Sequence, residues 1–279
     1  MELNELNYFI KIIELLILIY FYKYNIYKFK RCQNSEIEKY LLDINDIRAL
    51  KKVVYTALFG NYDELKPINK EIGYDYFLFT EQNYENITTN WTILNVEQNI
   101  NFTNKIDVMK KQRFYKTHPH LFFKNYDLSI YIDGTFEIKG NLDKFLLTIL
   151  SKNISIYVFE HPFLDSMINE FDAILFFKKD SPKHIIPVKE KYEREKFPDD
   201  NGHAECCLIV RKHNDINCIN FMEKWYYEIE HNSYRDQLSF NYIFWKTRKK
   251  IVKYISKNSI NEYFNQSQNH LKIFNFTML

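Results

Sequence analysis

A carboxylate at Asp133 directly follows a short, mostly apolar run, Leu128 to Ile132, which is rich in β-branched and aromatic residues. Such a run is typical of a strand that is buried on both faces of a parallel sheet. Ligands collect at the carboxyl ends of strands in open α/β sheets, and Gly134 lets the chain turn behind the acid. Asp133 is therefore the first candidate to meet a substrate or a metal. Asp-Gly is also a common turn pair, so a purely local turn is the alternative.

Length and composition set the broad class of protein. A chain of 279 residues, 46% of them hydrophobic, can bury one large α/β core or two small ones, and one catalytic domain with an appendage is the simplest organisation. The 38 basic and 36 acidic residues nearly balance, and no long basic tract is present, so we expect no nucleic-acid partner. The four cysteines form no CxxC pair and no zinc-type spacing, which indicates reduced, mostly buried thiols.

The first 50 residues differ from the rest of the chain. Residues 8–26 hold an apolar run that Lys11 and Glu14 interrupt and that several basic residues follow. A membrane-spanning helix needs about 20 apolar residues, so the segment is either a single-pass anchor or an interfacial or buried helix. The basic cluster favours a cytosolic body, whereas a lumenal enzyme requires the reverse topology, so localisation stays open. Residues 32–50 resemble a polar stem, and residues 51–279 form the body.

Along the body, apolar runs of strand length alternate with stretches of helical periodicity. Strands are expected at residues 53–59, 74–81, 91–96, 128–132, 136–140, 154–159 and 206–210, with one more edge strand after residue 251. Helices are expected at residues 104–116, 141–152, 163–179, 215–231 and 237–247, and residues 183–196 are either a solvated helix or a connection. This alternation predicts an α/β fold with a mostly parallel sheet flanked by helices.

Two groups of charged residues have both a functional and a structural interpretation. The helix expected at residues 104–116 carries Arg113 and Lys116, which either meet an anion or form a solvated helix face. Asp236 precedes the last expected helix, and the segment 233–236 fits a capping box in which that carboxylate only closes the helix start.

Six segments of the body, taken together, resemble the glycosyltransferase-like domain family that is named after its plant turgor-defect and seed-mucilage members (TOD/MUCI). They are residues 55–63, 113–120, 131–134, 160–162, 205–211 with 213–214, and 233–240. Each segment is weak evidence alone, but six in the same order are specific, and they span nearly all of residues 51–246. The resemblance implies a GT-A-like fold, that of nucleotide-diphospho-sugar transferases, and it leaves the first 50 residues unexplained.

A transferase of this type must neutralise a diphosphate leaving group, usually with Mn²⁺ or Mg²⁺ held by an Asp-x-Asp motif at the end of a central strand. The resemblance aligns that motif with Asp133-Gly134-Thr135, in which the second carboxylate is missing. Thr135 or Glu137 would then reach the ion, or a later residue would complete its coordination. The later candidates are His213 and Asp236. In the competing metal-free account, cations replace the ion, namely Arg113, Lys116 and Arg211.

The resemblance also implies sites for the donor and for catalysis. By analogy of fold, the nucleotide would lie at the end of the first strand, and the residues there are Thr56, Asn61, Tyr62 and Asp63. Glu81, after the second strand, would contact ribose or base. Glu205 or Asp236 would act at the sugar carbon or on the acceptor hydroxyl. The alternative for Glu205 is a structural ion pair with Arg211 or Lys212, and His118, His120 and His161 are more typical of structural imidazoles.

The expected function is transfer of a sugar from a nucleotide-sugar donor to a glycan, glycoprotein or lipid acceptor, with possible membrane association through residues 8–26. Two other functions stay open. The first is metal-dependent hydrolysis of a lipid amide, because the resemblance implies ceramidase activity in part of the family. Against it, the sequence has no zinc-type histidine pair at helical spacing and no activated serine motif. A non-catalytic sugar-binding protein is the other, because the Asp-x-Asp motif is incomplete.

Overall fold

The computed structural model describes residues 43–60, 63, 65–83, 89–96, 105–161, 166–199, 202–247, 250–256 and 258–266. The N-terminal apolar segment at 8–26 and most of the stem at 32–50 lie outside these residues. No helix within the described ranges has both the length and the apolar character that crossing a bilayer requires.

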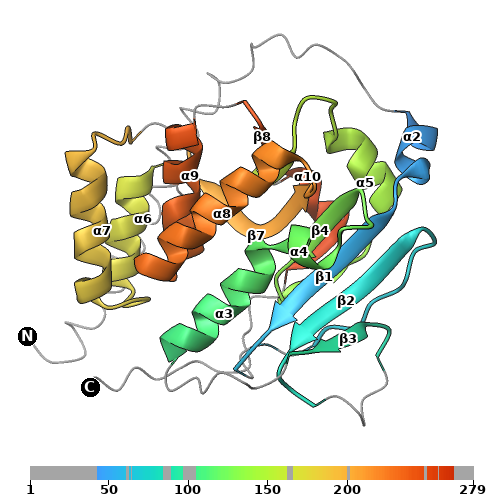
Figure 1. The fold of residues 1–279 in the computed structure, drawn as a ribbon, viewed down its shortest axis with the longest axis horizontal. Coiled ribbons are helices and arrows are strands. Elements are labelled where there is room, and N and C mark those ends of the chain that lie inside the picture. The colour runs from blue at the N-terminus through green and yellow to red at the C-terminus, as the bar shows by residue number, and fades with distance from the viewer. Residues whose placement is uncertain are drawn as a thin grey trace, which may run out of the picture.

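One mixed sheet forms the centre of the fold (Figure 1). Its strands, in spatial order, are β3 (Thr92–Asn95), β2 (Tyr74–Thr80), β1 (Lys52–Leu58), β4 (Leu128–Ile132), β7 (Ala204–Arg211), β6 (Ile156–Glu160) and β8 (Val252–Ile255). The pairs β1–β2, β2–β3, β1–β4 and β6–β8 are parallel. The expected edge strand after residue 251 is β8, and the predicted fold class, a mostly parallel sheet with flanking helices, is confirmed.

Strand β7 runs antiparallel to both of its neighbours, β4 and β6. Its start at Ala204 therefore lies at the edge where the parallel strands end, and its finish at Arg211 lies at the opposite edge. We call the first edge the carboxylate rim and define it by the strand ends Leu58, Thr80, Ile132 and Glu160 together with Ala204. The direction of β7 decides which predicted site residues can meet at this rim.

Two hydrophobic cores, one on each face, enclose the sheet. Alternation along β1 shows the division, because Val53 and Tyr55 belong to one core while Val54 and Leu58 belong to the other. The first core packs against α3 (Lys105–Thr117), α6 (Met167–Phe176), α7 (Pro182–Arg194), α8 (Ile216–His231) and α9 (Asp236–Thr247). The second core packs against α2 (Ile44–Ala49), α5 (Leu142–Ile149) and α10 (Asn258–Asn261). A short helix, α4 (Pro119–Phe122), precedes β4.

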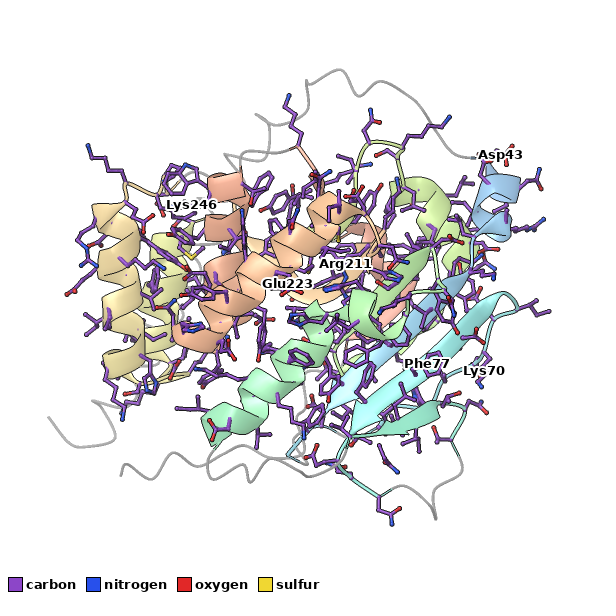
Figure 2. The ribbon with its side chains drawn as sticks, in the orientation of Figure 1. Asp43, Lys70, Phe77, Arg211, Glu223 and Lys246 are labelled. Atoms are coloured by element: carbon purple, nitrogen blue, oxygen red, sulfur yellow. The ribbon has the colours of Figure 1, made fainter. Side chains whose placement is uncertain are left out.

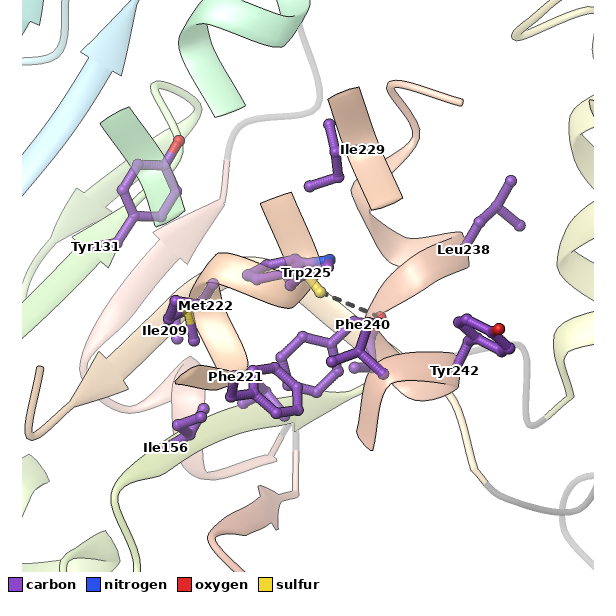
Figure 3. Packing of buried hydrophobic residues seen from close by; sticks show 14 of the residues in the cluster. Tyr131, Ile156, Ile209, Phe221, Met222, Trp225, Ile229, Leu238, Phe240 and Tyr242 are labelled. Carbon is purple, nitrogen blue, oxygen red and sulfur yellow. Dashed lines mark hydrogen bonds between the residues drawn. The ribbon is translucent and has the colours of Figure 1, made fainter. Parts of the chain in front are cut away.

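Aromatic packing fixes α8 and α9 against the sheet. Trp225 meets Phe240 edge to face with ring centroids 4.9 Å apart, and Phe221 lies 5.1 Å from the same ring (Figure 3). The Trp225 indole also donates a hydrogen bond to the backbone oxygen of Asp236 at 3.0 Å. This packing holds the start of α9 in place.

Two structural details correct or refine the sequence predictions. Residues 182–194 form α7, whose buried Ile185 and Tyr192 show that it packs against the core and is not wholly solvated. The predicted strand at 136–140 is β5 (Phe136–Ile138), which pairs with β9 (Phe264–Gln266) in a separate small sheet beside the rim. This small sheet follows directly on the Asp133-Gly134 turn.

Candidate functional site

Asp133 lies at the carboxylate rim, immediately after β4. Its backbone N–H donates to the carbonyl of Cys207 on β7 at 2.8 Å, which fixes the backbone at the end of the strand. Its Oδ1 accepts a 2.7 Å hydrogen bond from the Tyr131 hydroxyl, and Gln112 Nε2 donates to that hydroxyl at 2.6 Å. The Asp133 side chain keeps 28% of its surface exposed. The acid is therefore fixed in orientation and still open to solvent.

Two cations from α3 lie behind Asp133. Lys116 Nζ is 3.6 Å from Asp133 Oδ1 and 2.6 Å from Asp236 Oδ2, and Arg113 Nε is 3.3 Å from the same Asp236 oxygen. The Lys116 side chain is 1% exposed and that of Asp236 is 6% exposed. Burial excludes the interpretation of these cations as a solvated helix face. The two predicted cations and two predicted carboxylates thus form one network, which we call the Lys116 cluster: Arg113, Lys116, Asp133 and Asp236.

The charges in this cluster fix the protonation state of Asp236. Burial alone would raise the pKa of the carboxyl, but the charges of Arg113 and Lys116 and the hydrogen bond from Lys116 outweigh it and lower the pKa to about 2. A carboxylate with that pKa is a poor proton acceptor near neutral pH. The carboxylate also points to Lys116 and not to the helix start, so the predicted capping box at 233–236 is wrong; Ser233 Oγ donates to Asp180 instead.

A small pocket opens beside Asp133 between β1 and β4. Its lining includes Thr56, Leu58, Trp91, Asp133 and Gly134. Thr56 is 2% exposed, and its hydroxyl has no hydrogen-bond partner among the described residues. A buried hydroxyl without a partner is costly, so a polar ligand group in this pocket would satisfy it.

Gly134 permits a close approach of Asp63 to the Asp133 turn. A Cβ at position 134 would lie 2.5 Å from Leu58 Cδ2, 3.0 Å from Asp63 Cβ and 3.2 Å from Asp63 Oδ2. A glycine is therefore required here because of contact and not because of its backbone angle. The approach places a second carboxylate beside the incomplete motif, from a strand end that lies far away in sequence.

The donor set at this turn fits a hard divalent ion in part. Mg²⁺ and Mn²⁺ prefer carboxylate and other oxygen ligands; Asp133 supplies such oxygens, and Asp63 Oδ2 lies 3.2 Å from the place that a Cβ of the next residue, Gly134, would take. Thr135 is buried in the same turn, and Glu137 is exposed on β5. Asp236 is already bound to Lys116 and Arg113. The residues that would hold such an ion are therefore Asp133 and Asp63.

The remaining donor-site predictions lie at the rim or outside the described residues. Glu81 follows β2, and its Oε1 accepts a hydrogen bond from the backbone N–H of Gly60, which follows β1. The side chain of Glu81 thus joins the ends of the first two strands. Asn61 and Tyr62 lie outside the described part of the chain.

Glu205 is the second residue of β7 and lies at the same rim as Asp133. Glu205 is two residues before Cys207, whose carbonyl accepts the hydrogen bond from the Asp133 backbone N–H. Burial raises the pKa of the Cys207 thiol, and the charges of Glu205 and Asp133 raise it further. Glu205 is 9% exposed. The structural alternative for Glu205, an ion pair with Arg211 or Lys212, is wrong. Those residues lie at the other end of the strand.

Arg211 and His213 are not brought to the site. Arg211 pairs with Ser129 at the start of β4, is fully buried, and donates to the Lys116 backbone oxygen at 2.8 Å and to the Tyr55 hydroxyl (Figure 2). His213 is also fully buried, and its Nε2 donates to the carbonyl of Phe123 at 2.8 Å. Both residues lie at or just past the end of β7 that is opposite the carboxylate rim, and both side chains bind protein groups. This placement conflicts with the predicted roles in phosphate and metal binding.

A larger hollow lies at that opposite edge, between the starts of β1 and β2. Its lining includes Arg48, Lys51, Gly73, Asp75 and Tyr126. Size alone would favour it as a binding site. We place the candidate site at the carboxylate rim because ligands of open α/β sheets bind at strand ends and because the Lys116 cluster is there.

Comparison with known proteins identifies the family of the chain. The family described as TOD1/MUCI70, glycosyltransferase-like domain, matches residues 26–270. The chain belongs to this family. The TOD1/MUCI70 match covers both α3, which supplies Arg113 and Lys116, and the start of α9, which supplies Asp236.

The sequence did not indicate Tyr131 and Gln112 as the residues that orient Asp133. The one signal for Tyr131 is its position two residues before the acid.

No curated protein matches the chain. Among solved structures, the chain is similar to "WbbM bifunctional glycosytransferase apo structure", with a TM-score of 0.41, 10% identity, and coverage of 80% of this chain and 40% of that chain. It is also similar to "a glycosyltransferase involved in the glycosylation of the major capsid of PBCV-1", with a TM-score of 0.39, 9% identity, and coverage of 64% of this chain and 78% of that one. The chain thus spans less than half the length of the first, and similarities at this level add nothing to what the site itself shows.

Proposed function

We propose that this protein is a glycosyltransferase that moves a sugar from a nucleoside-diphosphate donor to a hydroxyl of a glycan, glycoprotein or lipid acceptor. The observation that carries the proposal is the Lys116 cluster: two buried cations lie directly behind a partly exposed carboxylate at the end of the central strand. Membership of a glycosyltransferase-like family supports it. A diphosphate is the leaving group that such a mixture of charges suits.

The donor nucleotide would bind across the ends of β1 and β2. Thr56 offers a buried hydroxyl to the pocket, and Glu81 lies at the neighbouring strand end. Hydroxyl and carboxylate groups at these positions are suited to hydrogen bonds with a base or a ribose. Thr56 and Asp133 line the same small pocket, and the diphosphate would lie on the Asp133 side of it.

The charges of Lys116 and Arg113 would act on the diphosphate from behind Asp133. Because Asp236 binds both cations and stays ionised, it is a positioning residue that keeps their charged groups fixed near Asp133. Asp133 and Asp63 would hold Mn²⁺ or Mg²⁺, and the bound ion would supply further positive charge to the departing diphosphate. In this proposal, the metal ion and the two protein cations would together neutralise the leaving diphosphate.

In the transfer step, the acceptor hydroxyl oxygen forms a bond to the anomeric carbon of the sugar. The bond from that carbon to the diphosphate oxygen breaks, and its electron pair leaves with the diphosphate. The hydroxyl proton passes to a general base. Glu205 is the proposed base because it lies at the carboxylate rim near Cys207, as Asp133 does, whereas Asp236 is a poor proton acceptor.

A turnover assay tests the proposal against its two rivals. The purified full chain is incubated with a panel of nucleotide sugars and Mn²⁺, and separately with ceramide, and release of nucleoside diphosphate or fatty acid is measured. We expect nucleoside diphosphate release that Asp133→Ala abolishes without loss of the fold. Consumption of ceramide alone would favour the lipid amide hydrolase. Binding of a nucleotide sugar with no turnover would favour the non-catalytic alternative.

A further inference from the structure

A second group of potential metal ligands lies where β6 ends and β7 begins. His161 directly follows β6, His203 directly precedes β7, and Glu170 lies in the first turn of α6. One ligand atom from each of the three side chains lies within 4.8 Å of the other two. The two histidines are fixed next to one another because the His161 N–H donates to the His203 carbonyl at 2.9 Å, which extends the strand pairing by one step.

The charge of Glu170 is buried but only loosely held. The residue is 2% exposed, and buried carboxylates are normally paired closely or bound to a metal. Its Oε2 lies 3.5 Å from His203 Nε2, whereas Lys116 and Asp236 in the same protein approach to 2.6 Å. Strong charge-assisted hydrogen bonds measure about 2.7–2.9 Å. The space between Glu170 and His203 is therefore wider than a direct bond requires.

His203 also has unused binding capacity. The residue is 3% exposed, and neither of its ring nitrogens makes a hydrogen bond within the part of the chain that the structure describes. A buried imidazole normally satisfies at least one nitrogen, because an unsatisfied polar group costs stability. The unsatisfied ring nitrogens are an observation independent of the clustering of the three residues. They indicate that a ligand is missing beside His203.

Arg235 contacts Glu170 from the other side. Its Nη2 lies 3.9 Å from Glu170 Oε1, whereas the histidine faces Oε2. Metal-binding carboxylates are commonly oriented by such an outer contact to the oxygen that does not bind the ion. Arg235 would thus leave Oε2 available and hold the carboxylate toward the histidines.

We propose that His161, Glu170 and His203 form a binding site for a divalent transition metal of the zinc class, separate from Asp133. Two imidazoles and one carboxylate suit zinc, whereas Mg²⁺ and Mn²⁺ prefer oxygen ligands alone. Bonds of about 2.0–2.2 Å around a tetrahedral ion place ligand atoms roughly 3.3 Å apart, so the His203–Glu170 spacing of 3.5 Å already fits. The ion would join the end of β6, the start of β7 and the start of α6, with one coordination position left open.

Cobalt substitution tests the site in the full-length chain. The protein is stripped with a chelator, titrated with Co²⁺, and followed by its visible d–d absorption and by elemental analysis; Zn²⁺ is then added as a competitor. We expect the strong absorption of a tetrahedral site to saturate at one Co²⁺ per chain and to be displaced by one equivalent of Zn²⁺, whereas Co²⁺ at Asp133 and Asp63 would not contribute to it. His161→Gln and His203→Gln should each weaken this binding at least tenfold.

Two controls separate this site from other binding. Asp133→Asn should retain the tetrahedral Co²⁺ signal, because Asp133 belongs to the other site. His184→Gln should also retain it, because His184, on α7, pairs with Asp180. If His203→Gln fails to fold, His161→Gln decides, since His161 is only partly buried. The proposal is overturned if the native chain gives no such signal, if the signal survives in His161→Gln, or if it is lost in Asp133→Asn.

Discussion

The ammonium group of Lys116 lies 2.6 Å from the carboxylate of Asp236, a residue 120 positions later in the chain. This contact ties α3 to the start of α9, and both side chains are almost fully buried. It also fixes the Lys116 ammonium 3.6 Å from Asp133, the acid at the end of the central strand. The candidate site thus depends on a buried ion pair between elements that only the fold brings together.

Asp236→Asn should lower the free energy of unfolding by about 3–5 kcal/mol, because it leaves the buried charges of Lys116 and Arg113 without their partner. Glu195→Gln is the matched control. Glu195 and Lys246 are also 2.6 Å apart, but their side chains are 32% and 48% exposed, so the loss should stay below about 1 kcal/mol. Urea denaturation measures both. Equal losses in the two variants would show that the Lys116–Asp236 pair has no special role in stability.

Gly134→Ala should abolish nucleotide binding and lower stability by about 1–3 kcal/mol, because its Cβ would collide with Leu58 and displace Asp63. Gly73→Ala is the control: Gly73 has a φ of +88°, so alanine there costs roughly 1–2 kcal/mol, but it lies at the opposite edge of the sheet. Calorimetric titration with nucleoside diphosphates should show binding to Gly73→Ala alone. Retained binding in Gly134→Ala would remove Asp63 from the site.

Glu205→Gln should reduce kcat about 10²–10⁴-fold and leave KM for the donor nearly unchanged, because a glutamine cannot accept the acceptor's proton. Glu137→Gln changes an exposed carboxylate on β5 and should keep the native kcat. Steady-state kinetics on both variants measures the effect. A native kcat in Glu205→Gln would leave the reaction without its proposed base.

Stability should fall as the pH is lowered from about 6.5 to about 4, in part because of His213. Burial lowers the pKa of this imidazole to about 4, so the unfolded state binds more protons than the folded state across that window. Above pH 6.5 the buried, neutral His213 makes its full contribution to the free energy of unfolding. Lowering the pH to about 4 removes that contribution, which is on the order of 3 kcal/mol. His213→Gln should flatten this part of the curve, whereas His118 and His120 titrate in both proteins. Chemical denaturation at a series of pH values measures the free energy of unfolding of both proteins. The same dependence on pH in the native protein and in His213→Gln would contradict the role of His213.

The sequence predicted the elements of the fold better than their mutual arrangement. The run 128–132 coincides with β4, because a strand buried on both faces must be apolar throughout. The direction of β7 is not encoded in its own residues, since a buried strand has the same composition whether it is parallel or antiparallel. The prediction of Arg211 and His213 as site residues fails for this reason, because the antiparallel direction carries them to the other edge.

From local sequence alone, a site residue can be predicted where chemistry and a strand end coincide; the family resemblance adds Asp63, Arg113, Lys116 and Asp236. Asp133 met that condition. The approach of Asp63 to Gly134 depends on packing between two strand ends, and the Lys116–Asp236 pair depends on a contact between two helices. The position of His161 at a strand end beside a proline is typical of a structural imidazole, and nothing local indicates Glu170 and His203, its neighbours in space. Such convergence requires the tertiary structure.

The most direct test of the central claim is a thermal-shift measurement of the native protein and Asp133→Asn against a panel of nucleoside diphosphates, with and without Mn²⁺. A ligand that binds only the folded state raises Tm by mass action. We expect at least one nucleoside diphosphate to raise the Tm of the native protein in the presence of Mn²⁺ and to have no effect on Asp133→Asn. A panel that leaves the native Tm unchanged, or that shifts both proteins equally, would contradict a nucleotide-sugar site at Asp133.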